Sequence, residues 1–123
     1  MEARTYDLED RLITFAIAVV KLTEAMPGSA AGRYYADQLL RSGGSPALHY
    51  GEAQGGESHR DFTHKIKIAL KELREAQVCL RIIKGAGLHP NEGETQTTLK
   101  EATELVAIFT KSVQTAEQRS SRR

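Results

Sequence analysis

Apolar residues recur in alternating steps of four and three along four stretches of the chain, a spacing that places them in one stripe down an α-helix. The stretches are 7–26, a segment that begins at Ser29 or Ala30, 58–84, and 95–118. The clearest stripe, in 58–84, consists of Phe62, Ile66, Ala69, Leu73, Ala76, Leu80 and Ile83. No stretch longer than a few residues shows the period-two alternation of a half-buried strand. The pattern therefore predicts an all-α fold with four helices.

Glycine and proline residues mark the ends of these stretches. Pro27 and Gly28 end the first, and Gly85, Gly87 and Pro90 follow the third. Because such short connections make sequential helices antiparallel neighbours, the chain predicts an antiparallel up-down-up-down four-helix bundle. We expect residues 1–118 to form this single domain and residues 119–123 to form a basic flexible tail.

The second helix must pass Gly43, Gly44 and Pro46, which all oppose helix formation. We predict one helix with a kink near Gly43-Pro46. The alternative is two short helices, in which Ser45 caps the second and Pro46 takes its first position.

Two of the predicted helices carry apolar residues away from their core stripes. Those of the first helix are Ile13, Ile17 and Val20, and those of the helix over 58–84 are Val78 and Ile82. A monomeric four-helix bundle buries one face of each helix, so a second apolar face needs another cover. We predict that these residues form a homo-oligomer interface. The alternative is that the loop before the last helix and the chain ends cover them.

The charge of the chain is segregated, although the net charge of its 123 residues is only +1. The stretch 58–84 contains seven Lys and Arg against three acids, and residues 119–123 add +3. Basic residues follow the face of 58–84 that lies opposite the core stripe, and with one histidine they form what we call the basic ridge. Its members are Arg60, His64, Lys67, Lys71, Arg74 and Arg81.

A ridge of this length, about 30 Å, can follow the phosphates of a nucleic-acid backbone without reading its sequence. The alternative interpretation is an ordinary solvated face, on which Glu72 and Glu75 pair weakly with the cations. The ridge has no aromatic residue, so stacking on single-stranded bases is not indicated.

The second helix also carries a polar seam, spaced by steps of four and three. Its members are Gln38, Ser42, Ser45, His49 and Glu52. A neighbouring stripe of small and apolar residues, including Gly43, would let another helix approach closely. We interpret the seam as a set of hydrogen bonds between helices; the alternative is a hydrolytic or small-ligand site that uses its Ser, His and Glu side chains.

Other chemistry finds little support in the sequence. No Glu-x-x-His pair of a di-iron bundle is present, and the four histidines lack metal-ligand spacing. No nucleophile-elbow pattern surrounds Ser42 or Ser45. We therefore expect no enzyme, no catalytic residue, no metal and no cofactor. The longest apolar run, 12–20, is interrupted by Thr14 and is too short to span a bilayer. No leader is visible, and Cys79 is the single cysteine. These features predict a soluble, cytoplasmic protein without a membrane partner.

Several short motifs of the chain are shared with one family. They are Gln38-Leu-Leu-Arg-Ser42, Ser45, Tyr50-Gly-Glu-Ala53, Ser58-His-Arg-Asp-Phe62 and Ile68-Ala-Leu-Lys-Glu-Leu-Arg-Glu75. In these motifs the chain resembles a family of small bacterial four-helix-bundle proteins encoded in intervening sequences of large-subunit ribosomal RNA genes. His49 is a departure, because many relatives have Asn there.

The resemblance implies an antiparallel bundle that assembles into a ring-like homo-oligomer, a pentamer, and a second helix that is continuous. A related accessory protein of diversity-generating retroelements is a basic pentamer that binds nucleic acid and a reverse transcriptase. The leading hypothesis is therefore a non-enzymatic homo-oligomer that binds RNA or another polyanion through the basic ridge and the arginine tail. Its rival is a protein-interaction scaffold that binds no nucleic acid.

Overall fold

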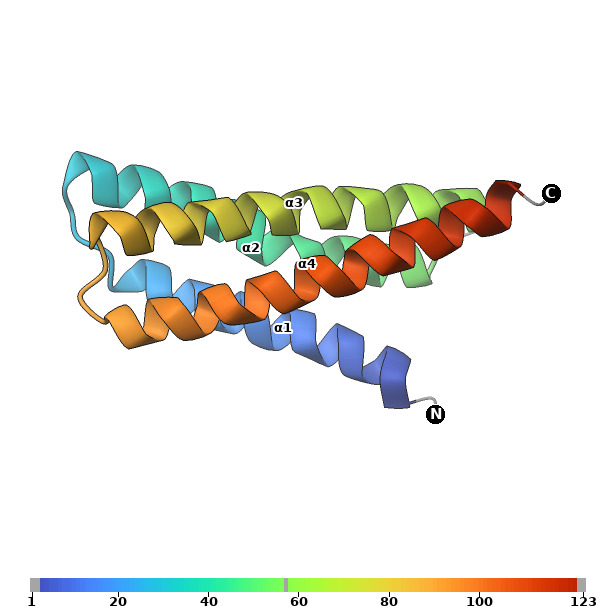
Figure 1. The fold of residues 1–123 in the computed structure, drawn as a ribbon, viewed down its shortest axis with the longest axis horizontal. Coiled ribbons are helices and arrows are strands. Elements are labelled where there is room, and N and C mark those ends of the chain that lie inside the picture. Colours follow the sequence, from blue (N-terminus) through green and yellow to red (C-terminus); the bar gives the residue numbers. More distant parts are fainter. Residues whose placement is uncertain (1–2, 57, 122–123) are drawn as a thin grey trace.

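The structure is a computed structural model that describes residues 3–56 and 58–121. These residues form four helices: α1 (Ala3–Glu24), α2 (Ala30–Gln54), α3 (His59–Ala86) and α4 (Glu92–Ser121). No strand occurs in the described residues. Consecutive helices alternate in direction, and the two ends of the chain lie at the same end of the bundle (Figure 1). The prediction of an all-α four-helix bundle is confirmed.

The helices are arranged so that each has two neighbours. α3 packs closely on α2 and α4, and α1 packs mainly on α2 and less on α4. Within the described residues the backbone of α1 does not come close to that of α3, nor that of α2 to that of α4, so these pairs lie diagonally across the bundle and meet only through core side chains. Towards its N-terminus α1 diverges from the other helices (Figure 1). The outer faces of α1 and α3 therefore point to different sides of the molecule.

The apolar stripes form the core, as the spacing predicted. Leu12, Phe15 and Val19 of α1 and Leu73 of α3 are buried. In α4 the steps of four and three that lead from Leu99 and Ala102 to Phe109 predict Val106 in the core, but Leu105 is fully buried in its place and Val106 is only half-buried.

Two threonines also belong to the core of α4, although the apolar pattern could not show it. The hydroxyl groups of Thr95 and Thr98 donate to the carbonyl groups of Asn91 and Glu94, one helical turn earlier. A hydroxyl that is satisfied within its own helix can be buried at little cost, so these side chains pack as small apolar groups would.

Capping residues explain where the helices begin and end. The Ser29 and Ser58 hydroxyl groups accept hydrogen bonds from the backbone N–H groups of Gly32 and Asp61, which satisfies one free donor at the start of α2 and of α3. Gly87 ends α3 with φ 64°, in the left-handed region that favours glycine. α4 begins at Glu92 and extends to Ser121, so it is longer at both ends than the predicted 95–118. Arg119 thus belongs to the helix; residues 122–123 of the predicted tail lie outside the described residues.

α2 is one helix that contains Pro46, so the alternative of two short helices is wrong. The kink near Gly43-Pro46 stays a prediction. Gly43 lies against α1: a Cβ atom at this position would stand 2.7 Å from Cγ2 of Val19. This confirms that the small-residue stripe allows a close approach of two helices.

His89 lies at the end of the bundle that holds the α1–α2 and α3–α4 loops, which we call the closed end. Its Nδ1 accepts from the backbone N–H of Asn91 at 2.9 Å, so its Nε2 carries the proton and donates to the Leu22 carbonyl at 3.0 Å. The ring is buried and joins the end of α1 to the loop before α4. His89 stands in a loop outside any periodic pattern, so this role could not be predicted from the sequence.

Candidate functional site

The basic ridge lies on the solvent side of α3. Its six members are all exposed. Only Lys67 forms an ion pair, with Glu117 of α4 at 3.0 Å; the other five pair with no residue of the described chain. The ridge therefore keeps five basic side chains, Arg60, His64, Lys71, Arg74 and Arg81, open to a ligand.

Glu72 and Glu75, which would pair with the ridge under the alternative interpretation, take up different positions. Glu72 turns towards α2, where its carboxylate lies 2.8 Å from Nδ1 of His49. Glu75 is exposed and stands beside the ridge. Lys65 is also turned away, since it pairs with Glu52 of α2 at 2.9 Å, and its hydrogen bond lowers the pKa of that carboxyl. The contacts between α2 and α3 thus engage one acid and one base of α3, Glu72 and Lys65, and no member of the ridge.

The polar seam faces α3 and holds the two helices together. His49 meets Glu72, and Glu52 meets Lys65. The Ser42 hydroxyl is buried and donates to the Gln38 carbonyl of its own helix. His49 pairs with Glu72, but neither Ser42 nor Ser45 forms a hydrogen bond with His49, so these described residues are not arranged as a Ser-His-Glu triad.

The predicted interface residues are exposed on two different helices. Ile13, Ile17 and Val20 of α1 are 44%, 50% and 40% exposed, and Val78 and Ile82 of α3 are 49% and 39% exposed. Since α1 and α3 are diagonal, these two apolar patches lie on different sides of the bundle. The prediction that they point away from the core is confirmed; what covers them is not shown.

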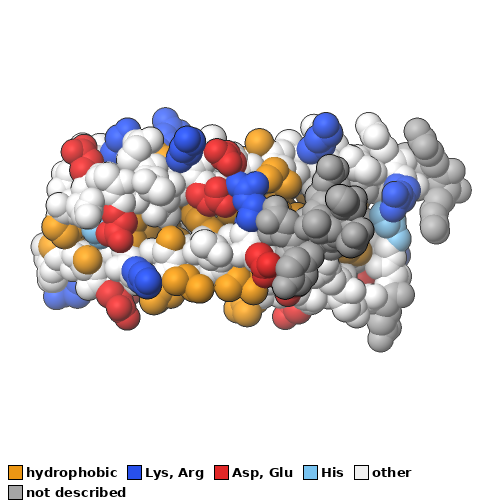
Figure 2. Space-filling view, turned by 90° about the horizontal axis from the view of Figure 1, so that it is seen from below, with side chains coloured by type: hydrophobic (Ala, Val, Ile, Leu, Met, Phe, Trp, Pro, Cys, Tyr) orange, Lys and Arg blue, Asp and Glu red, His pale blue; other side chains and the backbone are white. Residues whose placement is uncertain are grey.

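α2 carries three further exposed apolar residues, which its periodic pattern did not single out. They are Tyr34, Leu40 and Leu48, which are 57%, 45% and 68% exposed. Leu40 lies three residues before Gly43, which contacts Val19 of α1, so it stands at the α1 edge of α2. The view from the α1 side shows hydrophobic side chains gathered among charged ones along this face (Figure 2). Leu40 could have been found from the sequence by testing every apolar residue of α2 against the small-residue stripe.

The single cysteine has no catalytic environment. Cys79 is buried, and its thiol lies 3.5 Å from the Tyr35 carbonyl oxygen. Burial raises the pKa of the Cys79 thiol to about 11, so the thiolate needed for nucleophilic attack does not form near neutral pH. Across the described residues no cluster of three or more His, Cys, Asp or Glu could hold a metal ion. Nor is any described helix long and apolar enough to cross a membrane.

A family model described as "23S rRNA-intervening sequence protein" matches residues 5–111. The chain belongs to this family. The match includes α2 and α3 and therefore the seam and the ridge, and it confirms the resemblance seen in the sequence motifs.

One solved structure with the same fold is described as a protein with unknown function from the S23 ribosomal protein family of Bacteroides thetaiotaomicron VPI-5482. It is 24% identical, with a TM-score of 0.78 over 86% of this chain and 97% of that chain. At this identity the likeness supports the fold alone. No curated protein matches the chain.

Proposed function

We propose that the chain is a non-enzymatic, cytoplasmic homo-oligomer that binds RNA through the basic ridge on α3. The observation that carries the proposal is the row of exposed basic side chains, five of which have no partner in the described chain. Such a row supplies a salt-dependent, sequence-independent affinity for phosphates, because each neutralised phosphate releases counterions. The family description, which refers to 23S rRNA, is compatible with RNA as the polyanion.

The two apolar patches support an assembly that joins different faces of adjacent copies. A contact between the α1 patch of one copy and the α3 patch of the next would be heterologous, and heterologous contacts form a ring when the rotation between copies closes. We propose a ring, with five members as the family resemblance implies. Val78 and Ile82 stand near Arg74 and Arg81 in the chain, so a neighbouring copy would lie close to this end of the ridge. In such a ring RNA would mainly contact the end that begins at Arg60.

The RNA-binding proposal predicts a loss of RNA affinity when two unpaired cations towards the Arg60 end of the ridge are replaced by acids. Arg60→Glu combined with Lys71→Glu should weaken binding to a structured RNA about tenfold and reduce the slope of log K against log salt by about 2. Fluorescence anisotropy over a salt series measures both. The matched control, Arg41→Glu with Lys100→Glu, makes the same change in net charge at exposed positions of α2 and α4 and should bind nearly as tightly as the unaltered chain.

Equal losses in the two double variants would show that only net charge matters and would remove RNA binding from the ridge. Absence of RNA binding by the unaltered chain, together with retention of a specific protein partner, would favour the scaffold function.

The assembly proposal predicts that Ile17→Asp dissociates the oligomer, because it places a charge in the apolar contact. The side chain is half exposed in the single chain, so the fold should persist. Light scattering coupled to size-exclusion chromatography should give the mass of several chains for the unaltered protein and a smaller mass for the variant. Gln96→Asp, at an exposed position of α4 outside both patches, makes the same change in charge and should leave the mass unchanged. A monomeric unaltered protein would disprove the assembly.

A further inference from the structure

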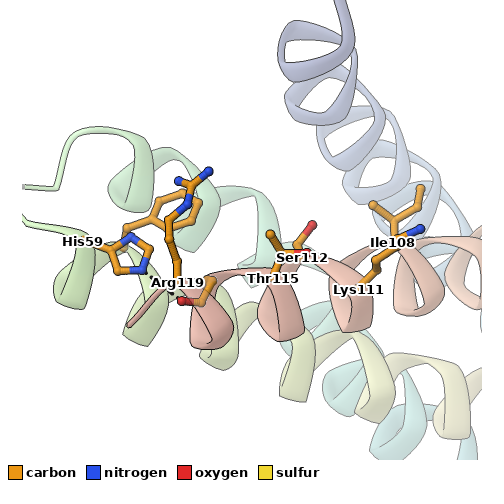
Figure 3. Close-up of a pocket in the computed structure, with 8 residues that line it drawn as sticks. His59, Ile108, Lys111, Ser112, Thr115 and Arg119 are labelled. Atoms are coloured by element: carbon orange, nitrogen blue, oxygen red, sulfur yellow. Dashed lines mark hydrogen bonds between the residues drawn. The ribbon is translucent and has the colours of Figure 1, made fainter. Parts of the chain in front are cut away.

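A hollow with a volume of about 520 Å³ lies at the end of the bundle where both chain ends lie, which we call the open end. It is formed between the first turn of α3 and the last turns of α4 (Figure 3). It lies where α1 diverges from the other helices and then ends before α4 does (Figure 1). Arg11 of α1 pairs with Glu104 of α4 at 3.0 Å; from these residues α4 continues to Ser121, whereas α1 extends back only to Ala3. About nine residues of α4, or about 14 Å of helix, therefore have no α1 neighbour.

The interior of the hollow is apolar on one side. Phe62 of α3 and Ile108 and Ala116 of α4 line it, and all three are at least half-buried. His59 fixes this wall, because its Nε2 lies 3.0 Å from the Ala116 carbonyl oxygen and its ring stacks on Phe62 with centroids 6.4 Å apart. The His59–Ala116 contact joins the two helices that form the hollow, so the apolar surface is preformed.

The rest of the lining is cationic and rich in hydroxyl groups. Arg119 lies beside His59 at one end, Lys111 lies beside Ile108 at the other, and Ser112 and Thr115 lie between them (Figure 3). None of the described residues that line the hollow carries a carboxylate, and neither Arg119 nor Lys111 pairs with another described residue. The nearby Glu117 is directed to the opposite side of α4, where it pairs with Lys67. The hollow therefore attracts anions and disfavours cations.

The hydroxyl groups of Ser112 and Thr115 differ from those elsewhere on α4. Five threonines of this helix donate back to a carbonyl four residues earlier, and they are Thr95, Thr97, Thr98, Thr103 and Thr110. Thr115 and Ser112 make no hydrogen bond with a described residue. Two hydroxyl groups without such a bond thus stand where a bound molecule would meet them.

We propose that this hollow binds a small amphipathic anion, with its apolar body against Phe62 and Ile108 and its carboxylate against Arg119. The volume lies within the range of about 300–1,000 Å³ that is typical of small-molecule sites, and a few polar groups in an apolar pocket are their usual lining. The guanidinium group suits a carboxylate because it donates two parallel hydrogen bonds. Ser112, Thr115 and Arg119 lie beyond residues 5–111, so the family match does not imply this site.

The first test compares three ligands of defined chemistry below their micellar concentrations: decanoate, decylamine and acetate. Isothermal titration should show decanoate binding once per chain, decylamine binding at least about tenfold more weakly, and acetate not binding. Decylamine that binds as well as decanoate would overturn the proposal, because the cationic lining would then play no role. Acetate that binds as well would show that the apolar wall is not used.

The second test places the ligand in the hollow. Arg119→Gln should weaken decanoate binding about tenfold, whereas Arg81→Gln, an exposed arginine of the ridge, should leave it unchanged. Thr115→Trp should block binding by filling the hollow, and Gln114→Trp, at the neighbouring exposed position outside the lining, should not. Loss of decanoate binding in Ile17→Asp but not in Arg119→Gln would place the ligand on the α1 patch and disprove the assignment. Arg119→Gln should lower RNA affinity much less than Arg60→Glu with Lys71→Glu, and that double variant should keep most of its decanoate affinity, which separates the two proposals.

Discussion

Replacing Phe109 with alanine is expected to lower the free energy of unfolding by about 3–5 kcal/mol. The side chain is fully buried in the middle of α4, and its ring packs edge-on against Tyr50 of α2 with centroids 5.8 Å apart. Truncation removes the apolar contacts of the ring and leaves a cavity between diagonal helices that α1 and α3 hold apart. Urea denaturation followed by circular dichroism measures the loss.

The neighbouring Ile108→Ala is the control for this prediction. Ile108 is half-buried and borders the hollow, so its removal opens space that solvent already reaches and should cost no more than about 1.5 kcal/mol. If the two variants lost similar stability, Phe109 would not occupy the tightly packed centre that the structure gives it.

Replacing the adjacent glycines Gly43 and Gly44 with alanine, one at a time, is expected to change the free energy of unfolding in opposite directions. A Cβ at Gly43 would stand 2.7 Å from Cγ2 and 3.1 Å from Cγ1 of Val19, so Gly43→Ala must push α1 and α2 apart, at a net cost of about 2 kcal/mol. A Cβ at Gly44 meets nothing within 4 Å, so Gly44→Ala should stabilise the helix by up to about 1 kcal/mol. Denaturation midpoints of the two variants should therefore fall on either side of that of the unaltered chain.

Val19→Ala combined with Gly43→Ala provides the control, because the smaller side chain on α1 makes room for the new methyl group. Part of the loss should be recovered relative to the sum of the single variants. Strict additivity would mean that the cost of Gly43→Ala does not arise from Val19.

The fold followed from the sequence because its signals are local. The steps of four and three located Leu12, Phe15 and Val19 in the core, and two of the predicted stretches begin at or beside Ser29 and Ser58, the residues that cap α2 and α3. Both features need only neighbouring residues. The outward positions of Ile13 and Ile17 followed from the same helical arithmetic.

The site was harder to predict because its features depend on how helices are aligned. The pair of His49 and Glu72 joins residues 23 positions apart and requires the register of α2 on α3. The hollow requires the register of α1 on α4, fixed by Arg11 with Glu101 and Glu104. A periodic pattern defines the face of a helix but leaves its translation along a neighbour free, so neither feature could be read from the sequence.

The two ends of the bundle differ in a way that should govern how the molecule opens. At one end buried His89 ties α1 to the loop before α4, so separation of the helices there must first break hydrogen bonds that no water can replace while the ring stays buried. At the other end the last turns of α4 rest mainly on α3. Local unfolding should therefore begin at the open end and run towards His89, and amide hydrogens should exchange in the same order. A molecule in the hollow would bind at the point where this opening starts, and by holding α3 and α4 together it would slow exchange along the whole length of both helices.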